Sequence, residues 1–301
     1  MSILAVGSVA FDTIETPVGK ATKVLGGSAN YFSIASSFFN SIRLVGIVGE
    51  DFPKEHVQFL KSKGICVEGL QVVSGGETFH WVGRYDERYS DAETLRTCLN
   101  VFENFSPKLP PSYRKTPYVF LGNIDPVLQA HVLEQMERPK VVACDTMNFW
   151  IKGKKEQLMN TLSMVDIFFI NESEARELSG EHNLVLAARK IRHMGPQILV
   201  IKRGEYGALM FTGDGVFSAP AYPLSRIVDP TGAGDTFAGG FMGYLAKSQK
   251  SFEEEYLRRA VVYGNTLASF VVEDFSFNRL QDLNYEKIQN RFNEFTALSS
   301  F

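Results

Sequence analysis

The sequence predicts an α/β fold, a doubly wound, mostly parallel sheet with a second, smaller β-sheet beside it. Apolar strand-like runs that alternate with helical patterns favour parallel pairing with a helix in each connection. This alternation opens the chain, with strands expected at 3–9, 42–49 and 66–73 and helices at 28–39 and after Asp51. The character changes after Gly75-Gly76, where residues 77–85 and 94–105 are strand-like with no helical pattern between them. Those two runs predict antiparallel strands outside the main sheet.

The alternation resumes after a proline-rich crossing at 107–117. An amphipathic stripe of Leu184, Ala188 and Ile191 predicts a helix over 183–194, which Gly195-Pro196 ends. The remaining expected strands are 118–122, 141–144, 166–170 and 198–202, followed by a hairpin at 208–211 and 215–217 and by helices at 237–245 and 256–272.

Composition excludes several classes of protein. The chain has 301 residues, 45% hydrophobic and 22% charged, which is enough apolar material for a sizeable core. The net charge is −3 and no basic block occurs, so we expect no nucleic-acid partner. We expect no membrane partner either, because no apolar run approaches the ~20 residues of a membrane helix. Cys66, Cys98 and Cys144 are odd in number and widely spaced, which favours free thiols and a cytoplasmic location.

The stretch from Asp229 to Phe241 reads D-P-T-G-A-G-D-T-F-A-G-G-F. A glycine turn into a helix leaves backbone N–H groups unpaired, and such groups attract anions. Asp235 stands in the first turn, where its charge would repel a stored phosphate. A carboxylate at this place suits a general base that takes a proton from an attacking hydroxyl. The alternative is an ordinary helix N-terminus, where a first-turn aspartate is common.

A second glycine-led stretch, Gly26-Gly27-Ser28-Ala29-Asn30, opens the helix expected at 28–39. Together, G-G-S-A-N and the later D-P-T-G-A-G-D-T-F resemble the two signatures of the ribokinase-like (PfkB) family of carbohydrate and nucleoside kinases. The resemblance covers nearly the whole chain and is weakest between Gly75 and Arg114. It implies one ribokinase-like kinase domain over residues 1–301 that uses ATP and Mg²⁺.

The resemblance also implies roles for individual residues. It implies Asp235 as the general base in a catalytic turn formed with Gly232, Ala233 and Gly234. It implies substrate contacts from Asp12, Gly26, Gly27, Asn30 and Asp235. It implies nucleotide contacts from Asn171, Lys202, Gly204, Gly232, Gly234 and Asn265. Glu174 would hold Mg²⁺ through water, since Mg²⁺ keeps part of its hydration shell, and Asp229 would ligate a monovalent cation.

From the residues alone, other interpretations stay open. Asp12 would also suit a local turn. Asn171 to Glu174 would also suit a helix start, where acidic residues favour the helix dipole. The D-x-x-N sequence from Asp145 to Asn148 resembles a family element near substrate and phosphate.

The family commonly carries a small β-sheet lid over its substrate, and we expect this lid at 13–25 and 75–106. Phe79, Trp81 and Tyr85 recur with period two and therefore share a face of the expected strand. That face would contact a sugar or a base, form the lid's own core, or pair two copies of the chain. We expect a homodimer through the lid.

We therefore expect an ATP-dependent kinase that transfers the γ-phosphate to a hydroxymethyl group of a sugar. One alternative is an adenosine-type nucleoside kinase of the same fold, with lid aromatics against the base. The other is a sugar sensor without catalysis, which the intact Asp235 and glycine turn argue against. No G-x-x-x-x-G-K-[ST] motif occurs in the sequence, which excludes a P-loop enzyme.

Overall fold

The computed structural model describes residues 1–89, 92–213 and 215–299. Within them, a nine-stranded sheet has the order β13-β12-β11-β10-β9-β8-β1-β4-β5. Only the pairs β11–β12 and β12–β13 are antiparallel among its described pairs. Its strands are β1 Ser2–Val6, β4 Ser41–Gly49, β5 Ile65–Val73, β8 Tyr118–Leu121, β9 Val141–Cys144, β10 Ile167–Asn171, β11 Ile198–Lys202, β12 Ala208–Phe211 and β13 Val216–Ala219. The predicted mostly parallel sheet is confirmed.

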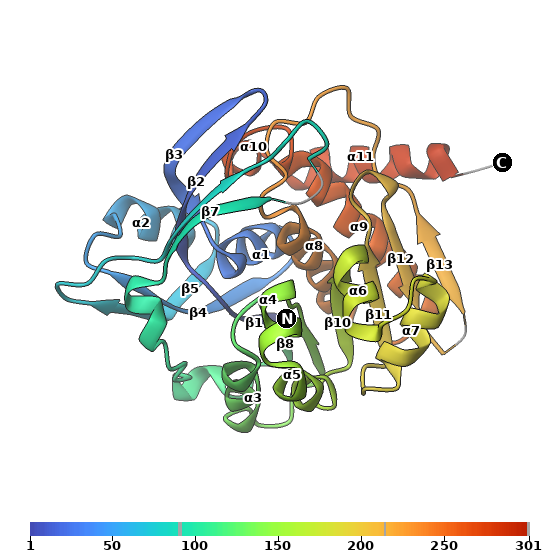
Figure 1. Cartoon of the computed structure of the whole chain (residues 1–301), viewed down its shortest axis with the longest axis horizontal. Coiled ribbons are helices and arrows are strands. Elements are labelled where there is room, and N and C mark those ends of the chain that lie inside the picture. The colour runs from blue at the N-terminus through green and yellow to red at the C-terminus, as the bar shows by residue number, and fades with distance from the viewer. Residues whose placement is uncertain (90–91, 214, 300–301) are drawn as a thin grey trace.

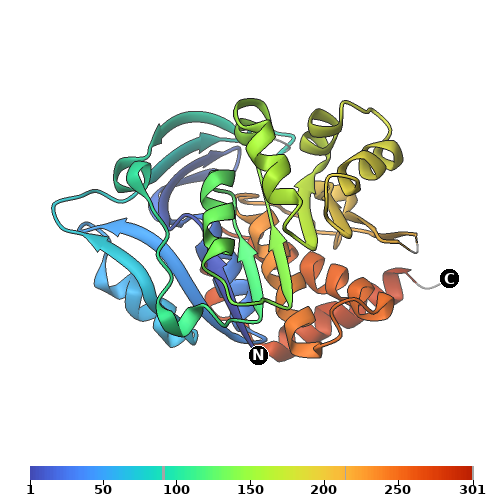
Figure 2. The ribbon, with the colours of Figure 1, turned by 90° about the horizontal axis from the view of Figure 1, so that it is seen from below.

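Helices cover both faces of this sheet, so the predicted doubly wound architecture is confirmed as well. Along β1, Ile3 and Ala5 face one hydrophobic cluster and Leu4 and Val6 face the other. The first cluster takes in α1 Ser28–Ser37, α2 Lys54–Ser62, α8 Ala233–Ser248, α9 Glu254–Val271, α10 Asn278–Gln281 and α11 Tyr285–Ser299. The second takes in α3 Pro126–Glu134, α4 Asn148–Gly153, α5 Lys155–Leu162, α6 Glu172–Ser179 and α7 Leu184–Arg192. Figure 2 shows the orange and red helices of the C-terminal third gathered on one side.

A separate four-stranded sheet has the order β3-β2-β6-β7. It lies to one side of the main sheet, at the upper left of Figures 1 and 2. Its strands are β2 Ala10–Thr16, β3 Gly19–Gly26, β6 His80–Arg84 and β7 Glu93–Cys98. The pair β6–β7 is antiparallel as expected, β2–β3 is antiparallel as well, and β2 and β6 pair in parallel. Of the range expected for the lid, residues 90–91 lie outside the described residues.

Two expected strands end early. The run 3–9 is not one strand, because β1 stops at Val6 and the chain turns into β2. Hydrogen bonds between Ser8 and Ser28 hold that turn, with Ser8 N donating to Ser28 Oγ at 3.2 Å and Ser28 N to Ser8 Oγ at 3.0 Å. The run 94–105 is also divided. β7 ends at Cys98 and a 3₁₀ turn follows at Asn100–Asn104, where the Asn100 side chain donates to the Thr78 carbonyl at 2.9 Å.

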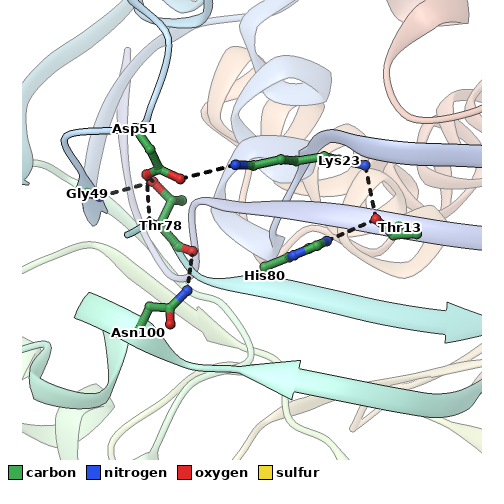
Figure 3. A network of polar contacts seen from close by, with 7 residues as sticks. All are labelled: Thr13, Lys23, Gly49, Asp51, Thr78, His80 and Asn100. Carbon is green, nitrogen blue, oxygen red and sulfur yellow. Dashed lines mark hydrogen bonds and ion pairs between the residues drawn. The ribbon is translucent and has the colours of Figure 1, made fainter. Parts of the chain in front are cut away.

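One polar network ties the smaller sheet to the loop that follows β4 (Figure 3). The Asp51 carboxylate accepts hydrogen bonds from the amide and hydroxyl of Thr78, at 2.8 and 2.7 Å. The Gly49 amide donates to the same hydroxyl at 3.0 Å. On the other side, Lys23 of β3 reaches Asp51 at 3.4 Å. The chain therefore enters β6 from a point that is fixed to the main sheet.

Candidate active site

The candidate site lies at the carboxyl ends of the parallel strands, where ligands of such sheets bind. Its centre is the N-terminus of α8. Gly232 caps this helix with φ 73°, a left-handed conformation that favours glycine. A Cβ on Gly232 would lie 2.4 Å from the Tyr31 ring. Glycine is therefore required here on two counts, and the predicted tight turn into the helix is present.

The first turn of α8 presents unpaired backbone amides. Ala233 N donates to the Pro230 carbonyl at 3.1 Å, and Thr236 N donates to the Gly232 carbonyl at 2.8 Å. Within the described residues, the amides of Gly234 and Asp235 between them have no acceptor. Such amides, at the positive end of a long helix, form a site for anions.

The Asp235 carboxyl lies beside these amides and is partly exposed. Burial of the carboxyl among protein atoms and the nearby charge of Asp145 raise the pKa of Asp235 to about 7, although the Lys202 charge opposes them. A carboxyl with a pKa close to neutral pH is well matched to proton transfer.

The Lys202 ammonium also reaches the start of α8. Its Nζ lies 2.5 Å from Asp145 Oδ2, and a Cβ on Gly234 would lie 2.9 Å from the same Nζ. Burial alone would lower the pKa of Lys202. The charges of Asp145, Glu174 and Asp235 outweigh that effect and hold the pKa above its ordinary value. Lys202 is therefore a cation at the anion site, in contact with a carboxylate that the sequence did not identify as its partner.

On the opposite side of the site, Asp12 belongs to β2 of the smaller sheet rather than to the end of β1. Its carboxylate covers Gly26 so closely that a Cβ there would lie 1.9 Å from Asp12 Oδ2. Gly27 has φ 93°, and a Cβ on it would lie 2.5 Å from the Ser8 carbonyl oxygen. The two glycines are needed because the chain passes directly against Asp12 and Ser8.

Asn30, in the first turn of α1, holds this glycine pair in place. Its Nδ2 donates to the Gly26 carbonyl at 2.6 Å. Its Oδ1 is buried and has no partner among the described residues. A buried acceptor without a donor is uncommon in folded proteins, and a ligand hydroxyl would satisfy it.

Asp229 is buried between the turn and the segment that follows α9. Its two oxygens accept backbone hydrogen bonds, from Thr231 N at 2.9 Å and from Ser276 N at 3.3 Å. Burial raises the pKa of Asp229 despite these bonds. In the structure Asp229 therefore fixes the shape of the turn.

Asn171 and Glu174 form the N-terminal cap of α6. Asn171 Oδ1 accepts from Glu174 N at 2.8 Å, and Glu174 Oε2 accepts from Asn171 N at 2.9 Å. The helix-start interpretation of these residues thus holds. The charge of Glu174 also raises the pKa of Lys202, so the two side chains lie near each other.

The described residues contain no cluster of three or more His, Cys, Asp or Glu side chains suited to a metal. Such a cluster is not needed for Mg²⁺ beside phosphates, because Mg²⁺ there uses one or two carboxylates and keeps several waters. Glu174, which is buried and acts on Lys202, supplies a carboxylate of that kind. The donor set fits a magnesium ion bound together with a nucleotide.

Of the two remaining predicted nucleotide contacts, Gly204 lies in the turn after β11 and Asn265 lies in helix α9. Gly204, with φ 55°, begins a 3₁₀ turn directly after β11, and a Cβ there would meet nothing within 4 Å. Asn265 of α9 donates from Nδ2 to the Pro220 carbonyl at 2.8 Å and so holds the loop after β13.

Asp12 is buried and feels the charges of Asp229 and Asp235 across the site, and both effects bear on stability. Burial and the charges of Asp229 and Asp235 raise the pKa of Asp12 from 3.8 to about 8, against the hydrogen bond from Gly27. Between these values the folded protein holds a proton that the unfolded chain has lost, so its stability falls as pH rises through that window.

We predict that Asp12→Asn, which removes this penalty, raises the melting temperature of the ligand-free protein at pH 9 by at least about 2 °C. The difference from the wild type should shrink toward pH 5. Calorimetric or fluorescence-monitored unfolding across the pH range provides the check. A variant that is no more stable than the wild type at pH 9 would contradict the burial and charge repulsion that raise the pKa of Asp12.

Comparison with known proteins identifies one family over most of the chain. The model of the pfkB family carbohydrate kinases matches residues 2–281. The cytidine kinase of Thermococcus kodakarensis is 32% identical over 252 residues, which cover 81% of this chain and 88% of that protein. The nucleoside kinase of Methanothermobacter thermautotrophicus is 27% identical over 304 residues, 90% of this chain and 89% of that protein. The deoxyribokinase of Salmonella typhi is 30% identical over 311 residues, 96% of this chain and 92% of that protein.

Solved structures agree on the fold. The Methanocaldococcus jannaschii nucleoside kinase aligns with a TM-score of 0.78 at 21% identity, covering 97% of this chain and 98% of that one. A putative ribokinase II from E. coli in complex with ATP and Mg²⁺ aligns with a TM-score of 0.78 at 17% identity, covering 97% of this chain and 99% of that one. The chain belongs to the PfkB family and is an ATP-dependent phosphotransferase that acts on a sugar or a nucleoside.

Proposed function

We propose that the protein transfers the γ-phosphoryl group of ATP to the 5′-hydroxymethyl group of a nucleoside, with Asp235 as the general base. The observation that carries this proposal is the position of the Asp235 carboxyl beside the unpaired amides of α8, with its pKa raised to about 7. A base next to an anion site suits an alcohol that attacks a phosphate.

The acceptor would bind between the two sheets. Asp12, on the smaller sheet, and Asn30 Oδ1, on α1, are acceptors that ribose hydroxyls would satisfy. Hydroxyl donors would also relieve the repulsion among the carboxylates, because they bring partial positive charge to Asp12. Gly26 and Gly27 let the backbone approach the sugar closely.

The phosphate side would be formed by the start of α8 and by Lys202. The amides of Gly234 and Asp235 and the ammonium of Lys202 would stabilise negative charge on the transferred group, with the Gly232 turn holding them in place. Asn171, Gly204 and Asn265 would line the rest of the nucleotide site. Mg²⁺, when bound with ATP, neutralises phosphate charge, and Glu174 would hold it through water.

The reaction itself needs one proton transfer from this chain. Asp235 takes the proton of the acceptor hydroxyl as that oxygen bonds to phosphorus, and it later releases the proton to solvent. Because Asp235 is partly exposed, the acceptor and the departing proton both have access to it.

A nucleoside acceptor is favoured because two relatives that cover most of the chain are named cytidine kinase and nucleoside kinase. A free sugar is the second candidate, and the deoxyribokinase match over 96% of the chain favours it. An ADP-release screen over nucleosides, pentoses and hexoses separates the two. Turnover with a nucleoside at least about tenfold above any free sugar supports the proposal, and the reverse order overturns it.

We propose that the smaller sheet, within residues 13–25 and 75–106, acts as a lid. Thr231 Oγ1 donates to the Tyr85 hydroxyl at 3.2 Å, so the chain just after β6 contacts the turn before α8. A lid that closes on this turn would exclude water from the phosphate.

We also propose that two copies pair through this sheet as a homodimer, because β7 is an edge strand with Leu95 exposed. A monomeric mass by light scattering at micromolar concentration would contradict that pairing. Cys66, Cys98 and Cys144 form no disulfide, which favours a cytoplasmic location for the protein.

For the lid, we predict that Tyr85→Phe lowers kcat/KM for the acceptor by about 2- to 12-fold, the value of one hydrogen bond, while ATP affinity is unchanged. Tyr118→Phe is the matched control, because it also loses a hydroxyl contact, at 3.1 Å to Ser251. Tyr118 begins β8 and therefore lies at the amino end of that strand, whereas the site lies at the carboxyl ends of the parallel strands. Equal kinetic effects of the two variants would count against the lid.

For the base, we predict that Asp235→Asn lowers kcat by at least about a hundredfold and leaves ATP affinity within a few fold. Asparagine keeps the size of the side chain and removes its basicity. Asp229→Asn is the control and should affect the chemical step less, because Asp229 holds the turn through backbone amides. If Asp235→Asn kept most of its turnover with the true acceptor, the proposed mechanism would be wrong.

A further inference from the structure

The contact between Asp145 and Lys202 joins two strand ends that are not neighbours. Asp145 follows β9, Lys202 ends β11, and β10 lies between these strands. The two side chains are 4% and 17% exposed, and their charged atoms lie 2.5 Å apart. The ion pair is therefore a buried contact inside the anion site.

Asp145 is held rigidly, whereas lysine is a flexible side chain. Asp145 N donates to the Leu121 carbonyl at 2.9 Å, and its own carbonyl accepts from Gln129 Nε2 at 3.0 Å. Its Oδ1 accepts from Thr146 N at 2.8 Å, which leaves Oδ2 for the ammonium. The long lysine side chain has many rotamers, so an ammonium without a fixed partner would be spread over many positions.

The place where the ammonium is held matters for phosphoryl transfer. Lys202 Nζ lies so near Gly234 that a Cβ there would be 2.9 Å away. Gly234 carries one of the unpaired amides at the start of α8. Groups that are already oriented toward developing charge stabilise a transition state without reorganising during the reaction. An unpaired carboxylate at the position of Asp145 would repel the phosphates. We therefore expect the role of Asp145 in this site to depend on Lys202.

We propose that Asp145 is a positioning residue, which holds the Lys202 ammonium over the N-terminus of α8 where charge develops on the transferred phosphoryl group. The proposal rests on the proposed kinase function and adds a residue that acts through Lys202 rather than on the substrate. The influence of both residues on Asp235 agrees with it, since Asp145 raises and Lys202 lowers the pKa of that carboxyl. Fixing the ammonium thus also fixes the electrostatic environment of the base.

The test is a double-mutant cycle of Asp145→Asn and Lys202→Met in the full chain, with kcat measured at saturating ATP and acceptor. Lys202→Met should lower kcat by at least about a hundredfold, as when one charge-stabilising donor is removed. Asp145→Asn should lower it by at least about tenfold, because a displaced group loses much of its effect. The double variant should stay within about threefold of Lys202→Met alone.

The matched control is Asp125→Asn. Asp125 makes an ion pair of the same length, 2.5 Å from Oδ2 to Lys154 Nζ, and it follows the carboxyl end of β8, the strand next to β9. Asparagine preserves its second contact, since Asp125 caps α3 by accepting from Val127 N, a role that Asn also fills. This variant should keep kcat within about threefold of the wild type.

Two further readouts do not depend on turnover. In thermal unfolding of the ligand-free protein, each single variant should have a lower melting temperature, because each leaves one buried charge unpaired. The double variant should lose less than the sum of the two single losses, because it leaves neither charge unpaired. ATP affinity by calorimetry should change by less than about threefold on Asp145→Asn.

Several outcomes overturn the proposal. If Asp145→Asn still lowered kcat in the Lys202→Met variant, Asp145 would act independently of the lysine. The same conclusion would follow if Asp145→Asn raised the Mg²⁺ concentration needed for activity both with and without Lys202. If Asp145→Asn bound ATP at least about tenfold more tightly and kept its kcat, Asp145 would only compete with phosphate for the Lys202 ammonium. Failure of the kinase proposal itself is distinguishable, because the wild type would then release no ADP with any nucleoside or sugar.

Discussion

Burial of several carboxyl groups in one poorly solvated site, to which repulsion between their charges adds, is the constraint on which the rest of the structure depends. Asp12 and Asp229 are buried, Asp235 lies close to them, and each has a raised pKa. Such a group of like charges destabilises a folded protein unless positive charge or hydrogen-bond donors oppose it. The glycine turns, the helix N-terminus and Lys202 all supply that opposition.

Each of the two sheets positions part of the site. The main sheet supplies the start of α8 and Lys202 at the ends of its strands, while the smaller sheet brings Asp12 against Gly26. Asp12 thus approaches the site from a strand of the smaller sheet, and Asp235 approaches it from a helix that packs on the main sheet. A ligand between them would relieve the repulsion, so binding of the acceptor and closure of the smaller sheet are expected to favour each other.

Local requirements made part of the site predictable from the sequence. The turn before α8 needs a left-handed residue and small neighbours, and Gly232 and Gly234 reveal that need directly. Alternation of strands and helices likewise predicted the main sheet. The contact between Asp145 and Lys202 was not predictable in the same way, because it depends on which side chains meet across β10. The end of β1 at Val6 also depends on a distant contact, that of Ser8 with Ser28.

The central claim is that Asp235 acts as a base whose ionisation the Lys202 charge favours. The pH dependence of kcat/KM for the acceptor tests it most directly. Since only the ionised carboxylate accepts a proton, the rate should fall as pH drops below about 7. Lys202→Met removes the charge that lowers this pKa, so the fall should begin at higher pH in that variant. A rate that is flat from about pH 5.5 to 8.5, or a shift of the limb to lower pH in Lys202→Met, would contradict the account.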